Sequence, residues 1–314
     1  MSYKIADQII WSHGHVFIHH RIIHGGLLPA VVESWFPHSN DTYGLLLEDD
    51  IELSPMFYAW VKLTVLRYRY LPFFLLCSAI PIFNAFFTRY GDPKNKIPHM
   101  FGISLYQQKH LELPLDGRQP FNPRTLFSSS GFAHPGTPYL SQIPCSWGAV
   151  YFPEQWREFH DYLTFRLSEV SIAIKEDIVP NVRSNRWSKS WKRFFIELIF
   201  LRGYVMLYPN YENFVSLSTN HLELGSHVKT RSKAKQDLFL LPLMQLPKEH
   251  KKCDLLDLPY GTLPPLDQLP VLNLTGSLTS VDIIVDTGRL RRDKLTGCNY
   301  PAKLYDIPSL MCIH

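Results

Sequence analysis

The fold is decided by the stretch TYGLLLEDDIELSP at residues 42–55. Its apolar run, residues 43–47, is too short for a helix and is bounded by turn residues, which predicts a buried, parallel strand. Three acids follow at once, at residues 48–50. Ser54-Pro55 then supplies an N-cap and a proline at the first helical position, so residues 56–67 should form a helix.

A strand, an acidic turn and a capped helix make half of a βαβ unit, whose ligands gather beyond the carboxyl ends of the strands. Glu48, Asp49 and Asp50 lie at that place. Clustered carboxylates repel one another unless a cation neutralises them, and Mg²⁺ and Mn²⁺ prefer such oxygen ligands. The pattern is therefore compatible with a metal site. The alternative is that these acids cap the following helix or lie solvated in the turn.

Further elements are predicted on both sides of this segment. Apolar spacing predicts a helix over 27–36 and another over 188–202 that ends at Gly203. Buried strands are expected at three places, and a helix opened by Pro153-Glu154 should follow the second of them. These strands are residues 99–106, 148–152 and 204–208.

Two segments depart from this α/β pattern. Residues 231–314 are rich in Pro, Leu, Lys and Asp, which predicts an irregular tail that wraps the domain of residues 1–230 or hangs free. Residues 71–87 are apolar but contain two prolines and an asparagine, and they are marginal for spanning a bilayer. The alternatives are a buried or surface-lying segment, or an insertion over 71–90 that is foreign to the fold, such as a retained intron.

Composition limits the class of protein. With 314 residues, of which 46% are hydrophobic, the chain can bury one large core or one core plus a smaller appendage. Its 32 basic and 28 acidic residues are dispersed, so no nucleic acid is expected as a partner. Five widely spaced cysteines form no C-x-x-C pair and receive no metal role. The first residues lack the features of a secretory signal.

Three segments resemble a eukaryotic group of family 2-like glycosyltransferases with a GT-A fold. They are ESWFPHSNDTYGLLLEDDIELSPMFYAWVK, PCSWGAVYFPEQWREF and LRGYVMLYPNYENFVSLSTNHLELGSH. The similarity covers roughly residues 8–230, apart from the apolar insertion. It implies an α/β, GT-A-like (Rossmann-like) domain with a mostly parallel sheet flanked by helices. It also implies that the chain begins after the first strand of that fold, so that the domain is incomplete at its N-terminus.

The activity that the resemblance implies is metal-dependent, inverting transfer of a sugar from a nucleotide-sugar donor to a glycan, lipid or protein acceptor. Association with secretory-pathway membranes is implied as well. Glu48-Asp49-Asp50 would stand for the D-x-D element, with Asp50 as ligand of Mn²⁺ or Mg²⁺ and its two neighbours toward the donor. GT-A enzymes often add a histidine to this metal, and His221 and His227 are the candidates. A structural hydrogen-bonding role is the alternative for both.

Two further roles follow from the resemblance. Ser146 and Trp147 lie in the loop that would meet the donor sugar, where Trp147 could stack on a pyranose; core packing is an equally good explanation. An inverting enzyme also needs a general base. The family's acidic pair is missing from residues 184–188, so Asp177 is named instead, with helix-surface solvation as its alternative.

A rival class is a catalytically silent GT-A scaffold that binds a glycan or a protein. A hydrolase that uses the carboxylates without a nucleotide is a third option. Titration of UDP- and GDP-sugars with Mn²⁺ separates the enzyme from the silent scaffold, and release of free sugar without nucleotide would identify the hydrolase.

Overall fold

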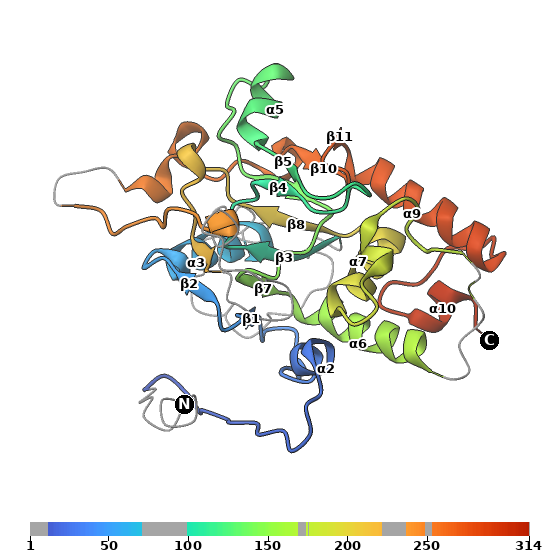
Figure 1. The fold of residues 1–314 in the computed structure, drawn as a ribbon. Coiled ribbons are helices and arrows are strands. Elements are labelled where there is room, and N and C mark those ends of the chain that lie inside the picture. The colour runs from blue at the N-terminus through green and yellow to red at the C-terminus, as the bar shows by residue number, and fades with distance from the viewer. Residues whose placement is uncertain are drawn as a thin grey trace, which may run out of the picture.

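The computed structural model describes residues 12–70, 99–168, 174, 176–221, 237–248 and 253–313. Within them, a seven-stranded sheet forms the centre of the molecule in the order β1-β7-β3-β8-β6-β10-β11 (Figure 1). Its strands are β1 (Gly44–Leu46), β3 (Met100–Ser104), β6 (Tyr139–Ser141), β7 (Ala149–Tyr151), β8 (Val205–Tyr208), β10 (Val271–Leu272) and β11 (Leu278–Thr279). Two small ribbons pair β2 (Ile51–Leu53) with β9 (Ser218–Asn220), and β4 (His110–Leu111) with β5 (Gln119–Pro120).

The sheet is mixed in direction. β3 pairs with β8 and β6 pairs with β10 in parallel, whereas the other neighbours in the sheet are antiparallel. An α/β sheet flanked by helices is confirmed, but the expectation of a mostly parallel sheet is wrong. The resemblance implied the mostly parallel sheet, and the apolar run at residues 43–47 favoured a parallel strand because such runs are typical of parallel sheets. Here β3, β7 and β8 are buried on both faces. A strand buried in this way has an apolar sequence whether its neighbours run parallel or antiparallel to it.

The first strand differs most from expectation. Among the described residues β1 is an edge strand, which pairs with β7 in antiparallel register, and Leu45 is 38% exposed. The prediction of a buried, parallel strand over 43–47 is therefore wrong in burial and in direction. An apolar run reports side-chain character, and it does not report whether a second strand lies alongside.

The helices agree better with the sequence because their signals are local. The expected helices correspond to α2, α3, α6 and α7, although α2 ends earlier than predicted and α7 begins later. Pro153 opens α6, and Gly203 ends α7 with a left-handed φ of 68°. The helices are α2 (Leu27–Val32), α3 (Phe57–Val65), α5 (Pro123–Ser129), α6 (Pro153–Leu167), α7 (Trp191–Arg202), α9 (Val281–Thr296) and α10 (Ile307–Met311). A π-helical turn, η1 (Leu66–Tyr70), extends α3, and the 3-10 turns are η3 (Arg183–Arg186), η4 (Glu212–Phe214), η5 (Asp237–Phe239), η6 (Asp254–Leu256), η7 (Pro259–Gly261) and η8 (Leu266–Gln268).

Both faces of the sheet are covered. Alternate residues of a strand point to opposite faces, and β7 shows this: Tyr151 packs with α6 and α7, whereas Val150 packs with α3. Trp156 and Trp191 lie in the core between the sheet and the helices α6 and α7. Trp60 lies in the core between the sheet and α3. The acidic turn after β1 is thus fixed at one edge of a well-packed sheet.

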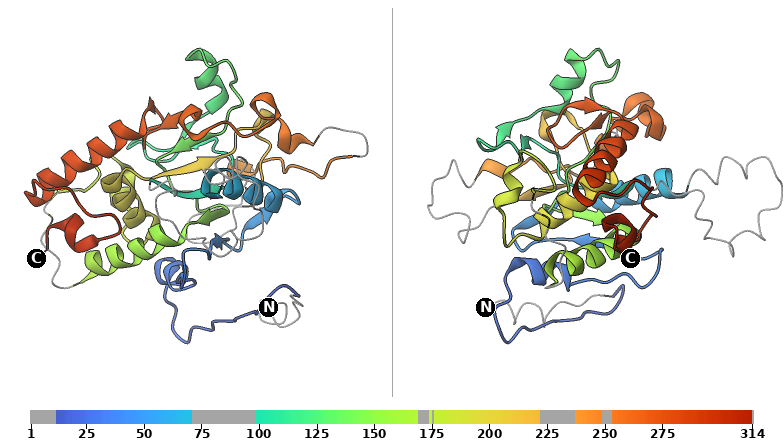
Figure 2. Two further views of the ribbon diagram at one scale, coloured as in Figure 1. Left: turned by 180° about the vertical axis from the view of Figure 1, so that it is seen from behind. Right: turned by 90° about the vertical axis from the view of Figure 1, so that its right-hand side faces the viewer.

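The C-terminal segment contributes regular structure. β10 joins the sheet, α9 packs on α7, and α10 packs on α6 and α9 (Figure 2). An irregular tail is therefore wrong for residues 271–311, although residues 237–248 and 253–270 consist mostly of 3-10 turns and irregular structure. The helix signals were present but lay among prolines: Ser280 accepts a hydrogen bond from Ile283 N at 3.3 Å, and Gly297 ends α9.

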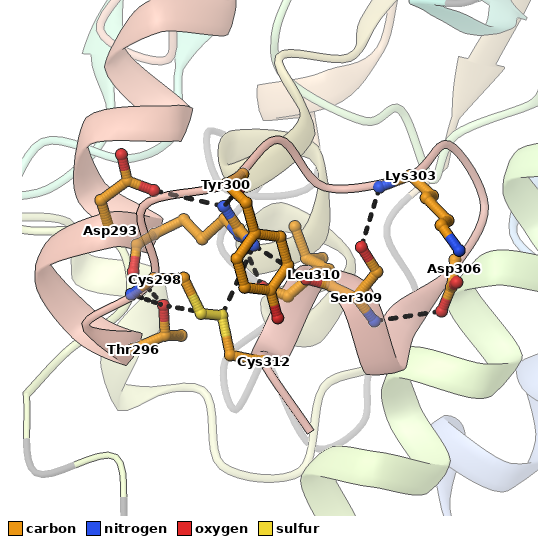
Figure 3. The surroundings of a disulfide bond; sticks show 10 residues. Asp293, Thr296, Cys298, Tyr300, Lys303, Asp306, Ser309, Leu310 and Cys312 are labelled. Atoms are coloured by element: carbon orange, nitrogen blue, oxygen red, sulfur yellow. Dashed lines mark hydrogen bonds and ion pairs between the residues drawn. A yellow bond between two sulfur atoms is a disulfide. The ribbon is translucent and has the colours of Figure 1, made fainter. Parts of the chain in front are cut away.

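A disulfide joins the end of α9 to α10 (Figure 3). Cys298 and Cys312 are bonded, and their Cα atoms are 6.3 Å apart, a usual separation for a disulfide. Beside it, the buried Arg292 donates hydrogen bonds to the carbonyls of Ser309 and Leu310, at 2.9 and 2.8 Å. Covalent and polar contacts therefore fix α10.

The membrane alternatives for the apolar segment stay predictions. Residues 71–90 lie outside the described part of the chain. Among the residues that are described, no helix is long and apolar enough to cross a bilayer.

Candidate functional site

The acidic turn joins β1 to β2 at the edge of the sheet. Asp49 is exposed, whereas Glu48 and Asp50 are partly buried. Ile51 N donates to Glu48 O at 3.2 Å and closes the turn, and His221 N donates to Asp50 O at 2.9 Å. The β2–β9 pairing thus brings the backbone of His221 beside that of Asp50, while the role of His221 as a metal ligand stays a prediction.

The side chain of His221 contacts a different acid. Its Nε2 lies 2.6 Å from Oε2 of Glu52, and both side chains are about half exposed, at 48% and 58%. Glu52 was not among the predicted site residues. Its signal was the alternation along an extended chain, which puts Asp50 and Glu52 on the same face.

The acidic turn is crowded with negative charge, and Lys192 is a cation that acts on it. Asp50 Oδ1 is buried and has no hydrogen-bond partner among the described residues. Burial, followed by repulsion from Asp50, raises the pKa of Glu48 to about 7, while Lys192 acts in the opposite direction. A buried oxygen without a partner is costly, so this turn is a suitable place for a cation.

A buried ion pair lies next to the turn. Lys192, at the start of α7, is 2.8 Å from Oε2 of Glu112, and their side chains are only 7% and 12% exposed. Lys192 Nζ also lies 5.6 Å from the ring centre of Trp147. Glu112 was not among the predicted site residues, because the residues around it form no motif and its partner is 80 positions away.

The loop of Ser146 and Trp147 lies against the β2–β9 ribbon. Ser218 Oγ donates to Trp147 O at 2.6 Å. Gly148 has a φ of 89°, and a Cβ there would lie 3.0 Å from the Ser218 side chain. The loop and the acidic turn are therefore both attached to this ribbon, which supports the prediction that they belong to one site.

The ring of Trp147 is packed on other aromatic rings. Its centroid is 4.3 Å from that of Phe239 and 4.9 Å from that of Tyr106. These contacts favour the packing alternative for Trp147 in this conformation. A sugar could stack there only if Phe239 moved.

A small cavity adjoins both this ring and Glu112. It has a volume of about 10 Å³ and is lined by Glu112, Cys145, Trp147 and Tyr208, among others. This volume admits about one water molecule. The cavity can therefore hold a single hydroxyl-sized group.

The remaining candidates are not joined to the acidic turn. Asp177 is exposed, and its carbonyl accepts a hydrogen bond from Arg291 of α9. None of the contacts among described residues links it to Asp50, so its role as general base stays a prediction. His227 lies outside the described residues.

The protein donors suit a metal that also binds substrate. The described residues include no group of three His, Cys, Asp or Glu side chains placed to hold a metal ion. Mg²⁺ and Mn²⁺ sites in nucleotide-using enzymes commonly have only one or two carboxylates, completed by phosphates and water. Asp50, with its unpartnered oxygen, fits such a site.

One comparison with known proteins gave a match. Residues 2–94 and 118–172, just under half of the chain, are similar to the family described as SPBC1E8.03c C-terminal domain. The acidic turn and the Ser146-Trp147 loop lie in the matched residues, whereas Glu112, Lys192 and His221 lie outside them. No curated protein matches the chain.

Proposed function

We propose that this chain is a metal-dependent glycosyltransferase that moves a sugar from a nucleotide-sugar donor to an acceptor with inversion. The observation that carries the proposal is the buried, unpartnered Oδ1 of Asp50 next to Glu48, whose pKa is raised to about 7. Such oxygens are stabilised when a divalent cation binds among them. The resemblance of three segments to family 2-like glycosyltransferases supplies the reaction.

In this proposal each residue has one role. Asp50 would bind Mn²⁺ or Mg²⁺, and His221 would be a further ligand of that ion. Glu48 and Asp49 would contact the nucleotide-sugar donor. The cation would stabilise the negative charge of the diphosphate leaving group. The Cys298–Cys312 disulfide supports an oxidising compartment, in agreement with the secretory-pathway location that the resemblance implies.

Titration of the full chain with Mn²⁺ tests the metal site. Calorimetry with UDP-glucose or GDP-mannose should show donor binding that depends on Mn²⁺. We expect Asp50→Asn to weaken Mn²⁺ binding at least about tenfold, because a neutral amide is a poorer ligand than a carboxylate. Asp116→Asn is the matched control, since Asp116 is exposed and accepts hydrogen bonds from the Gln119 side chain.

The rival proposal is a silent GT-A scaffold that binds a glycan or a protein. It is favoured by the Phe239 ring, which covers Trp147, and by the adjoining cavity, which admits only one water. Donor binding that is absent, or that Asp50→Asn leaves unchanged, would support this rival against the enzyme.

A further inference from the structure

Glu112 is a further carboxylate near the three acids of the acidic turn. It follows β4, and its charge acts on Glu48, Tyr106 and Cys145. Its side chain is 12% exposed, so it lies in the interior beside the site. A buried carboxylate needs a charged or hydrogen-bonding partner, and Lys192 is that partner at 2.8 Å.

Lys192 holds this carboxylate in one place. The lysine belongs to the first turn of α7, whose packing on α6 and α9 fixes it, and its ammonium lies 5.6 Å from the Trp147 ring centre. Its charge also acts on Glu48. The Lys192 ammonium therefore links Glu112 to the loop of Trp147.

The cavity beside Glu112 is the right size for a reacting hydroxyl. Its volume of about 10 Å³ admits one water or one hydroxyl group. Glu112 and Trp147 both line it, and Trp147 belongs to the loop that is attached to the β2–β9 ribbon.

We infer that Glu112 is the general base of the proposed glycosyl transfer, an inference that rests on that proposed function. The Glu112 carboxylate would take the proton of the acceptor hydroxyl while its oxygen forms a bond to the anomeric carbon. The bond from that carbon to the β-phosphate oxygen breaks, and its electron pair leaves with the nucleoside diphosphate. The proton on Glu112 then passes to solvent.

This assignment replaces Asp177 in that role. A general base must come within about 2.6–3.2 Å of the hydroxyl that it deprotonates. Asp177 is exposed beside α9, and its backbone is bound to Arg291. Glu112 lies beside Trp147, with which it lines a cavity and shares Lys192 as a neighbour, whereas no contact among the described residues joins Asp177 to that loop.

The test uses water as the acceptor. Full-length protein is incubated with Mn²⁺ and UDP-glucose, UDP-N-acetylglucosamine or GDP-mannose, and release of UDP or GDP is measured beside the donor Kd. General bases contribute about 10²–10⁴-fold, so Glu112→Gln should slow release at least about 100-fold with an unchanged donor Kd. Formate should restore activity to Glu112→Ala. Glu176→Gln is the control, an exposed glutamate that is also ion-paired, to Arg291 at 3.0 Å.

The outcomes separate this inference from the proposed function. Wild-type protein that binds no donor with Mn²⁺ would overturn both. If the wild type binds donor but releases no nucleotide, or if Glu112→Gln releases it at the wild-type rate, only the base assignment is overturned. If Glu112→Gln fails to fold, Glu112→Asp is used instead, because it keeps the charge but has a side chain shorter by one methylene. We expect this variant to release UDP or GDP at least about tenfold more slowly than the wild type. Release by that variant at the wild-type rate would also overturn the assignment.

Discussion

The acidic turn shows how few residues determine the chemistry of this site. Asp50 has one buried oxygen without a partner, and the neighbouring ammonium of Lys192 is already engaged by Glu112. The turn therefore has more negative than positive groups within reach, and this imbalance is what a divalent ion would correct. The local sequence predicted the acids, whereas the placement of the ammonium depends on α7.

His160 gives a residue-scale prediction about pH. Burial lowers the pKa of its imidazole below the ordinary 6.5, although a contact with Trp35 O at 3.3 Å acts in the opposite direction. Because the pKa of His160 is lower in the folded state than in the unfolded state, the unfolded state binds more protons near pH 6. The stability that neutral His160 contributes is therefore complete above the unfolded pKa of 6.5 and is lost as the pH falls below it. We expect His160→Asn to reduce the loss of unfolding free energy between pH 7 and 5, measured by urea denaturation.

The control for this prediction is His24→Asn, because His24 is exposed. Its pH dependence should match that of the wild type. An equal loss of stability on acidification in His160→Asn and wild type would contradict the prediction. Some dependence should persist in the variant, because burial also lowers the pKa of His99 and His110.

At the scale of elements, Gly288 lets α9 approach α7 closely. A Cβ at Gly288 would lie 2.3 Å from the carbonyl oxygen of Phe200 and 2.7 Å from that of Leu201. Any larger side chain must therefore separate the two helices. We expect Gly288→Val to lower the free energy of unfolding by about 1–3 kcal/mol, as overpacked sites do.

Chemical denaturation measures this effect, and Leu290→Ala is its matched control. Leu290 lies on the same helix and is 60% exposed, so its truncation should change stability little. If Gly288→Val were as stable as Leu290→Ala, the helices would not be in the close contact described.

Local signals predicted many of the elements, and long-range pairing explains the rest. Pro153 and Gly203 mark the start of α6 and the end of α7, and both are visible in the sequence. Strand direction and the edge position of β1 depend on which strands become neighbours. Neighbouring strands can be far apart in the sequence, so a short stretch of residues does not reveal them. The Glu112–Lys192 ion pair was missed for the same reason, since α7 and the loop after β4 meet only in the fold.

At the scale of the whole molecule, the C-terminal segment completes the domain. α9 packs on α7, and β10 pairs with β6 on the side opposite β8. We expect a chain that ends at residue 270 to be insoluble or to unfold without a cooperative transition, because it exposes the β6 edge and the α9-facing side of α7. Soluble yield and thermal unfolding measure this.

A chain that ends at Gly297 is the matched comparison. It keeps β10, β11 and α9 and loses α10 and the disulfide. We expect it to fold with a lower Tm, because a disulfide of this loop length contributes about 3 kcal/mol. Equal solubility and equal Tm of both shortened chains would show that the C-terminal segment is an independent appendage.

The order of strands also has a consequence for how the chain is made. β6 lies between β8 and β10 in the sheet. β10 is translated last of the three, and it must pair with β6, which left the ribosome long before. Contacts of such high sequence separation slow folding and leave strand edges open to association in the meantime. Biosynthesis of this protein should therefore depend on chaperones until β10 has emerged.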